Sequence, residues 1–295
     1  MKKADDFAPE VLQLFDKYVH GLIDRRGFLA NAARYAVGGV TAAMLLESLN
    51  PRFAEARQVA ENDPRLFARF VNYASPEGYG TMRGLLVQPV KAVGKLPGVL
   101  VVHENRGLNP HIEDIARRLG LDNFLAFAPD ALFPLGGYPG DEDSARELFP
   151  KLDQKKTQQD FVAAANYLKN LPECNGRIAA IGFCYGGGIA NMLATRLPDL
   201  AAAVPFYGNQ PAAAEVAKIK APLLLHYAEN DERINAGWPA FESALKAHGV
   251  NYQMYQYPGT QHGFNNDTTP RYDEAAAKLA WSRTLEFLNK NMGHD

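Results

Sequence analysis

A cysteine lies between two glycines in the segment GFCYG, residues 182–186. The apolar run 177–181 before it predicts a buried strand, and residues 186–194 after it predict a helix. A sharp turn from strand to helix strains the central residue, and flanking glycines provide the necessary clearance. A thiolate presented on such a turn, at the start of a helix, can attack a carbonyl carbon. The spacing therefore predicts Cys184 as a catalytic nucleophile.

A thiolate nucleophile needs a base within hydrogen-bond reach and a third group that orients the base. His262, in the turn PGTQHGF, is the predicted base, and Asp231, in the segment END, is the predicted orienting acid. Glu229 lies two residues before Asp231 and could take its place. The intervals between nucleophile, acid and histidine are each long enough for a strand and its crossover connection. The three residues can therefore lie on successive strands of one sheet.

The sequence after residue 60 alternates short apolar runs with helical stretches, which predicts an α/β fold with a mainly parallel sheet flanked by helices on both faces. The first two strands are expected to form a hairpin. The expected strands are 70–73, 84–88, 98–103, 124–128, 177–182, 201–207, 222–226 and 252–257, and the expected helices include 112–121, 158–169, 238–248 and 272–289. Ligands of such sheets bind beyond the carboxyl ends of the strands, where all three predicted catalytic residues fall.

Two further segments are expected at this edge of the sheet. The residues Glu104, Asn105 and Arg106 directly follow the strand 98–103. The backbone N–H groups of Tyr185 and Asn105 are predicted to hold the oxyanion that forms during attack. The connection 131–150 is rich in glycine and proline, and we expect it to act as a lid.

The chain from about residue 68 to residue 290 resembles the dienelactone hydrolases (carboxymethylenebutenolidases), a family of α/β-hydrolases. The shared marks are the G-x-C-x-G-G elbow, the acid after a later strand, the Pro-Gly-x-x-His-x-Phe turn and the glutamate in the segment HENRG, residues 103–107. The resemblance implies an α/β-hydrolase fold and a triad of Cys184, Asp231 and His262. It also implies that Glu104 contacts the resting thiol and helps to convert it to a thiolate.

The implied activity is hydrolysis of a lactone or small carboxylic ester through a thioester on Cys184, without a cofactor. Members of this family hold a substrate carboxylate with arginines, and Arg106, Arg146 and Arg233 are the candidates here, with Tyr138 of the lid as a further one. A general carboxylesterase or thioesterase on the same triad is an alternative. A non-catalytic binding protein that has kept the fold is another.

Composition limits the partners. The chain has 295 residues and a formal net charge of −2 without long runs of one sign, which favours a small-molecule substrate over nucleic acid or anionic lipid. Its two cysteines, Cys174 and Cys184, are predicted at opposite ends of one strand, roughly 30 Å apart, whereas a disulfide needs Cα atoms within about 7 Å. No histidine, cysteine or carboxylate cluster has metal-ligand spacing, so no metal is expected. A homo-oligomer remains possible.

The remaining histidines divide into two groups. His103 and His226 lie within or at the ends of predicted strands and are expected to belong to the core. The others have no partner that the sequence indicates; they are His20, His111, His248 and His294.

The first sixty residues allow two interpretations. The segment DRRGFL at 24–29, an apolar run at 35–46 and AEA at 54–56 resemble a twin-arginine export signal, which would place the protein in the periplasm. Apolar residues at helical spacing between Phe7 and Leu22, with Asp24 as an N-cap, predict instead a retained helical extension of a cytoplasmic protein. Residues 1–60 are thus one unit and 61–295 the catalytic domain. No stretch is long and apolar enough to span a membrane.

Overall fold

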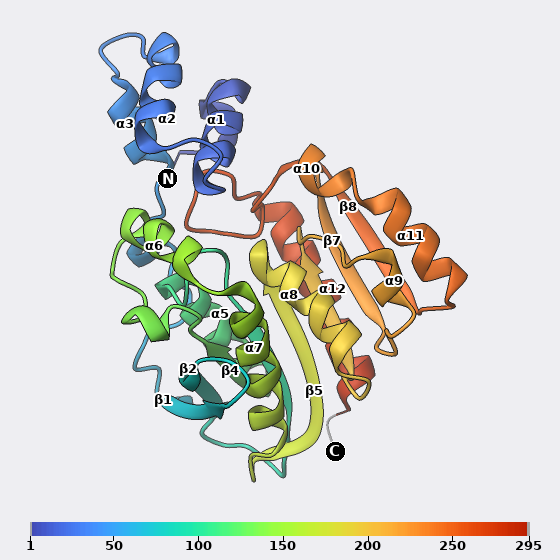
Figure 1. Ribbon diagram of the computed structural model, residues 1–295. Helices are drawn as coiled ribbons and strands as arrows, with labels where there is room; N and C mark the ends of the chain where they lie inside the picture. The colour runs from blue at the N-terminus through green and yellow to red at the C-terminus, as the bar shows by residue number, and fades with distance from the viewer. Residues whose placement is uncertain (1, 294–295) are drawn as a thin grey trace.

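The computed structural model describes residues 2–293, and its centre is an eight-stranded sheet with the order β1-β2-β4-β3-β5-β6-β7-β8 (Figure 1). The strands are β1 (Leu66–Ser75), β2 (Gly80–Pro89), β3 (Leu96–Val102), β4 (Leu125–Pro129), β5 (Cys174–Phe183), β6 (Ala202–Phe206), β7 (Leu223–Asn230) and β8 (Tyr252–Gln261). From β4 to β8 every neighbouring pair is parallel, while β1, β2 and β4 pair antiparallel. The predicted mainly parallel α/β fold is confirmed.

Each face of the sheet packs against a different set of helices, because successive apolar side chains of a strand point to opposite faces. Along β3, Leu100 and Val102 belong to one core cluster, and Val99 and Val101 belong to the other. The first cluster packs against α7 (Gln154–Lys169), α8 (Tyr185–Arg196), α9 (Ala213–Val216) and α11 (Trp238–Ala247). The second packs against α5 (Pro110–Leu121) and α12 (Glu274–Met292). The two layers hold the carboxyl ends of the strands in fixed positions.

The connection after β4 is compact. It contains two short 3-10 helices, Phe133–Leu135 and Phe149–Lys151, on either side of α6 (Glu142–Leu148). Asp130 organises its first part, because its carboxylate accepts hydrogen bonds from the backbone N–H groups of Leu108, Leu132 and Tyr138. The predicted lid is therefore an ordered segment at the carboxyl edge of the sheet.

The N-terminal segment is helical and has a small core of its own. Its helices are α1 (Pro9–Val19), α2 (Arg25–Ala32), α3 (Ala42–Leu49) and α4 (Phe53–Ala56). Phe7, Val11 and Tyr18 of the predicted apolar repeat are buried, but Leu22 lies beyond the end of α1 and is 65% exposed. Asp24 caps α2, accepting a hydrogen bond from the backbone N–H of Gly27 at 2.7 Å. Within residues 2–293, no helix has both the length and the apolar character that a membrane span needs.

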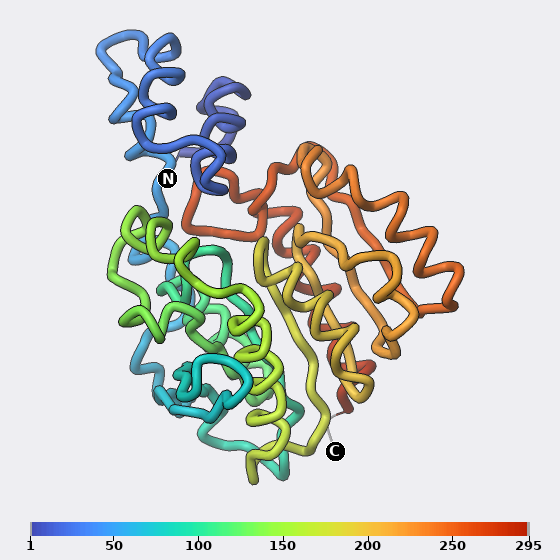
Figure 2. The backbone as a smooth tube through the Cα atoms, viewed as in Figure 1, coloured from blue at the N-terminus to red at the C-terminus, as the bar shows by residue number. Residues whose placement is uncertain are grey.

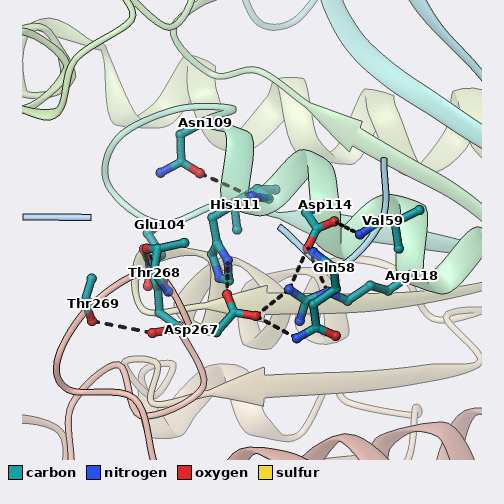
Figure 3. A network of polar contacts seen from close by, with 12 residues as sticks. Gln58, Val59, Glu104, Asn109, His111, Asp114, Arg118, Asp267, Thr268 and Thr269 are labelled. Atoms are coloured by element: carbon teal, nitrogen blue, oxygen red, sulfur yellow. Dashed lines mark hydrogen bonds and ion pairs between the residues drawn. The ribbon is translucent and has the colours of Figure 1, made fainter. Parts of the chain in front are cut away.

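These helices lie above the carboxyl edge of the sheet, next to α6 (Figure 2). A buried polar network fixes the chain where they join the sheet domain (Figure 3). Asp114 on α5 accepts hydrogen bonds from the backbone N–H groups of Gln58 and Val59. Arg118 bridges Asp114 and Asp267, and Asp267 also accepts a hydrogen bond from the Gln58 side chain at 2.8 Å. The network connects the N-terminal segment to α5 and to the loop between β8 and α12, which are far apart in sequence.

Candidate active site

The predicted elbow is present between β5 and α8. Cys184 is the N-cap of α8 and has φ = 53°, a left-handed conformation that side chains other than glycine rarely adopt. A Cβ atom on Gly182 would lie 1.8 Å from the carbonyl oxygen of Gly186, and one on Gly186 would lie 2.2 Å from that of Val102. Both glycines are therefore needed for the strand and the helix to pack so closely that the cysteine is presented at the edge.

The predicted acid and base meet at the ends of β7 and β8. Nδ1 of His262 lies 2.6 Å from Oδ2 of Asp231, and both residues are buried. The other oxygen of Asp231 caps the short helix α10 (Glu232–Asn235) through the N–H of Ile234. Glu229, the competing acid, is exposed and accepts a hydrogen bond from the backbone N–H of Gly259. Asp231 is thus the carboxylate that orients the imidazole.

The side chains of Cys184 and His262 lie close enough for each to affect the ionisation of the other. Their ligand atoms, together with those of His20, lie within 4.8 Å of one another. Burial alone raises the pKa of Cys184, but the charges of His262 and His20 and the hydrogen bond with His20 outweigh burial and lower it to about 5. Burial lowers the pKa of His262, whereas the Cys184 thiolate and Asp231 raise it, to about 10. The site therefore favours a thiolate beside a protonated imidazole.

His20 is the residue that the sequence did not indicate. It follows α1 of the N-terminal segment, and its Nε2 lies 3.4 Å from Sγ of Cys184. Asp16 and His20 are four residues apart on one helical face, and Oδ1 of Asp16 lies 3.3 Å from Nδ1 of His20. This acid and histidine spacing is the one local signal that could have marked His20 as more than a surface residue.

Glu104 lies in the same cavity as Cys184, but its carboxylate accepts a hydrogen bond from the side chain of Asn266 at 3.0 Å. Among the hydrogen bonds of the described residues, the one that involves Sγ of Cys184 is shared with Nε2 of His20. The implied contact between Glu104 and the resting thiol stays a prediction, while an imidazole from the N-terminal segment lies at hydrogen-bond distance from Sγ.

The predicted oxyanion donors occupy suitable elements. Tyr185 is the first residue of α8, so its N–H belongs to the free amino end of that helix. Asn105 follows β3 and lines both cavities next to Cys184. Its side chain is already engaged, because Nδ2 donates a hydrogen bond to the carbonyl oxygen of Val19 at 2.9 Å. The backbone N–H of Asn105 stays a predicted donor.

All three candidate arginines contact the N-terminal segment. Arg106 donates a hydrogen bond to the carbonyl oxygen of Val19 at 2.9 Å. The guanidinium of Arg146 lies over the ring of Tyr18, 4.3 Å from its centroid, and Arg233 lies 3.0 Å from Nε2 of His20. Tyr138, in contrast, donates its hydroxyl hydrogen to Glu142 on α6. The sequence offered no reason to connect these arginines with residues 18–20.

A cavity of about 430 Å³ opens beside Cys184, within the size range of small-molecule sites. The three arginines line it, together with Tyr185 and Tyr207. A narrower cavity of about 40 Å³ on the side of His262 is lined by His20, Glu104 and Asp143 among others. The larger space is positively charged on balance, because Glu147 is its only acidic lining residue among those described.

His20, Cys184 and His262 could also be metal ligands, since imidazole nitrogen and thiolate sulfur atoms at this spacing can coordinate one ion. Motif spacing in the sequence does not reveal this cluster, because its three residues follow α1, β5 and β8 and are far apart along the chain. However, the guanidinium of Arg233 lies 3.0 Å from Nε2 of His20 and would repel a cation there. The arrangement fits a thiolate held between two imidazoles better than a metal site.

The other histidines lie away from the elbow or serve the core. Nε2 of His103 accepts a hydrogen bond from the backbone N–H of Ala131, and His226 contacts Tyr257 and Thr284 in the second core cluster. Burial lowers the pKa of His226 to about 3, so it is neutral in the fold. Nδ1 of His111 lies 3.2 Å from Oδ1 of Asp267 within the anchoring network (Figure 3). His248 is exposed after α11, and His294 lies outside the described residues.

Comparison with known proteins gives a consistent result. The model of the dienelactone hydrolase family matches residues 82–292, and a second model, described as YqhI-like, matches residues 1–37. A provisionally named hydrolase fragment of Escherichia coli strain K12, YghX, is 51% identical over 114 residues, which cover 39% of this chain and 97% of that protein. A provisionally named carboxymethylenebutenolidase of Salmonella typhi is 34% identical over 222 residues, covering 70% and 82%.

Solved structures agree with the sequence matches. A crystal structure from Klebsiella pneumoniae, provisionally named a dienelactone hydrolase, superimposes with a TM-score of 0.66 and 28% identity. The superposition covers 76% of this chain and 99% of the other. The matched region contains the elbow, the acid and the histidine turn described above. This chain is therefore an ester-acting hydrolase and belongs to the dienelactone hydrolase family of the α/β-hydrolase superfamily.

Proposed function

We propose that this protein hydrolyses a lactone or small carboxylic ester through a thioester on Cys184. The observation that carries the proposal is the meeting of Cys184, His262 and Asp231 at one edge of the sheet, with a half-buried cysteine whose pKa is lowered to about 5. A thiolate at neutral pH is the form of cysteine that attacks carbonyl carbon.

The steps follow from the positions of these groups. The Sγ electron pair forms a bond to the carbonyl carbon, and the resulting oxyanion is held by the N–H groups of Tyr185 and Asn105. Collapse breaks the carbon–oxygen bond and releases an alkoxide or enolate, which takes a proton from an imidazolium beside Sγ. His262, oriented by Asp231, then removes a proton from water, which attacks the thioester and releases the acid and the thiolate.

The larger cavity indicates the charge of the substrate. Arg106, Arg146 and Arg233 line it, so a carboxylate or other anionic group on the acyl part would find complementary charge there. A planar guanidinium can hold a carboxylate through two hydrogen bonds. An anionic enol lactone or ester is the substrate class that this lining favours.

Removal of the nucleophile tests the proposal. Cys184→Ala should abolish hydrolysis across a panel of lactones and aryl esters, and Cys184→Ser should lower kcat by on the order of 10³-fold or more. Cys174→Ser is the matched control, because Cys174 is buried at the opposite end of β5 and should leave the activity unchanged. Acid-quenched parent enzyme should carry the acyl mass on the peptide containing Cys184. Full activity of Cys184→Ala would overturn the proposal.

Two alternatives differ in what the panel would show. A general carboxylesterase or thioesterase on the same triad would hydrolyse neutral and anionic esters equally well, whereas the proposed function predicts preference for a carboxylate-bearing lactone. A binding protein that has kept the fold would hydrolyse none of the panel. The lowered pKa of Cys184 favours an enzyme, because a buried structural thiol is normally inert.

A further inference from the structure

The N-terminal segment places a second imidazole on the nucleophile. The side chain of His20 is only 12% exposed, and its Nε2 is 3.4 Å from Sγ of Cys184, within hydrogen-bond distance for sulfur. Its ring meets the ring of His262 edge to face, with centroids 4.9 Å apart. Cys184 therefore lies between an imidazole after β8 and an imidazole after α1.

His20 is held in a defined orientation. Its Nδ1 lies 2.7 Å from the carbonyl oxygen of Asp16 and 3.3 Å from the carboxylate of the same residue. Arg271 donates a hydrogen bond to that carboxylate at 3.4 Å. Burial raises the pKa of Asp16, but His20, His262 and Arg271 outweigh burial and hold it well below its usual range. With Nδ1–H donated to Asp16, Nε2, which faces Sγ of Cys184 and Arg233, is the nitrogen of His20 that can take or give a proton.

Four groups from different elements face His20, and they determine its charge. Asp16 and the Cys184 thiolate favour the imidazolium, while His262 and burial oppose it; the net result is a raised pKa. Arg233 on α10 lies 3.0 Å from Nε2, and a guanidinium can only donate a hydrogen bond, so it stabilises the neutral ring. Because two adjacent imidazolium ions repel, one proton is shared among Sγ and the two Nε2 atoms.

We propose that His20 is a further catalytic residue, which accepts the proton of the Cys184 thiol at Nε2 and later donates it to the leaving group. This inference rests on the proposed function. In the first step the S–H bond breaks and an N–H bond forms on His20. After attack, the carbon–oxygen bond breaks and the leaving oxygen takes this proton, which returns His20 to its neutral form. Once Sγ is acylated and the leaving oxygen has taken the shared proton, His262 is neutral as well and can remove the proton of the hydrolytic water.

If His20 accepts the thiol proton, Glu104 is not needed for that step, which agrees with its position. The family resemblance assigns the activation of the thiol to this carboxylate, yet here it is hydrogen-bonded to Asn266. An imidazole can accept a proton near neutral pH and can also donate one, whereas a carboxylate that stays charged disfavours a thiolate beside it.

The first test measures ionisation of Cys184 without any substrate. The rate of its alkylation by iodoacetamide is followed from about pH 4 to about pH 9 in the full-length parent, His20→Gln and His248→Gln. Glutamine keeps the approximate size of histidine and an N–H donor but cannot take a proton. We expect His20→Gln to raise the apparent pKa of Cys184 by about one unit, which is about tenfold slower alkylation below that pKa. The exposed His248 is the matched control and should give the parental profile.

A purely covering role would give a different result. If His20 only shields the thiol, its replacement would speed alkylation at every pH and leave the apparent pKa unchanged, and that outcome would overturn the inference. Asp16→Asn provides a second variant in case His20→Gln fails to fold. It should shift the apparent pKa of Cys184 in the same direction by less, because it weakens only the support of His20.

The second test separates this inference from the proposed function. With a series of esters, His20→Gln should lose more activity on alkyl esters, whose leaving groups need a proton, than on nitrophenyl esters, whose leaving groups do not. Equal losses on both would contradict proton donation by His20. If Cys184→Ala stays active while His20→Gln still shifts the alkylation profile, the proposed function fails and the contact between His20 and the thiol stands.

Discussion

At the scale of single residues, the proposed activity depends on the ionisation of Cys184. Desolvation of this half-buried cysteine would by itself suppress the thiolate, yet two imidazoles reverse the effect and bring its pKa to about 5. The partner His262 moves in the opposite direction, to about 10, because the thiolate and Asp231 stabilise its protonated form. The thiolate and the shared proton therefore coexist over a wide pH range.

The pKa values of Cys184 and His262 predict the pH profile of kcat/KM. A lowered thiol pKa means that the thiolate persists on acidification until about pH 5, and a raised imidazole pKa means that the imidazolium persists until about pH 10. We expect a plateau between these values and a fall of about tenfold per pH unit on each side. Steady-state kinetics of the parent and Cys174→Ser should give the same profile. An acidic limb near the usual thiol pKa of about 8.5 would contradict the electrostatic argument.

The orienting acid can be tested against its neighbour. Asp231→Asn should lower kcat by on the order of 10² to 10⁴-fold, because an amide no longer fixes the tautomer of His262 or stabilises its charge. Glu229→Gln should keep nearly full activity, because Glu229 is exposed and contacts the backbone of Gly259 instead. A large loss in Glu229→Gln would show that the two acids have been assigned the wrong way round.

At the scale of secondary-structure elements, the elbow depends on the contact between β5 and α8. A Cβ on Gly182 would meet backbone atoms of Gly186 at 1.8 Å, and backbone atoms cannot move aside cheaply. Gly188 lies one turn into α8, and a Cβ there would find its nearest atom at 3.6 Å, an ordinary van der Waals contact.

These two glycines should respond to alanine in opposite ways. Gly182→Ala should lower the free energy of unfolding by about 3 kcal/mol or more, since the added methyl overpacks a rigid contact. Gly188→Ala should leave it unchanged or raise it by up to about 1 kcal/mol, because alanine favours the helix. Urea denaturation followed by circular dichroism measures both. Equal stability of the two variants would show that β5 and α8 can separate without cost.

The anchoring network is the element that holds the N-terminal segment near the site. Asp114→Ala should remove two backbone hydrogen bonds to residues 58 and 59 and leave Arg118 with Asp267 alone (Figure 3). Breaking a buried ion pair costs about 3 kcal/mol or more. We expect faster limited proteolysis between residues 50 and 63 in this variant. Glu274→Gln, whose ion pair with Lys278 is exposed, is the control and should resist proteolysis as the parent does.

At the scale of the whole molecule, the proposed active site draws on two parts of the chain. The N-terminal helices contribute His20, and they engage Arg106, Arg146 and Arg233 through residues 18–20. A twin-arginine signal cleaved near residue 56 would remove all of these contacts. The contacts therefore favour the interpretation that residues 1–60 stay with the catalytic domain.

Mass spectrometry of the protein isolated from its native cells tests this expectation directly. Retention predicts peptides from α1, including His20, in the same proportion as peptides from the catalytic domain. A mature chain that starts near Arg57 would show that the export interpretation is correct and that the contacts described here belong only to the precursor.

Much of this protein could be predicted from local patterns. Strands and helices alternate in ways that hydrophobic periodicity reveals, and the glycines around Cys184 report a backbone conformation that few other residues allow. The histidine turn and the acid segment follow strands, so the order of the sheet brings them to one edge. These features depend on neighbours within a few residues, which is why the sequence alone was enough to infer them.

Tertiary structure alone determined the partners of these groups. His20 and Cys184 are 164 positions apart and come from separately packed units, so no periodicity or spacing rule connects them. The hydrogen bonds of Asp231 to His262 and of Glu104 to Asn266 depend in the same way on which loops meet at the edge of the sheet. The contacts of the arginines with residues 18–20 depend on how the N-terminal segment packs against that edge. Such contacts are set by the shape and charge of surfaces that exist only after folding, because the sequence specifies each surface separately and only packing decides which atoms meet.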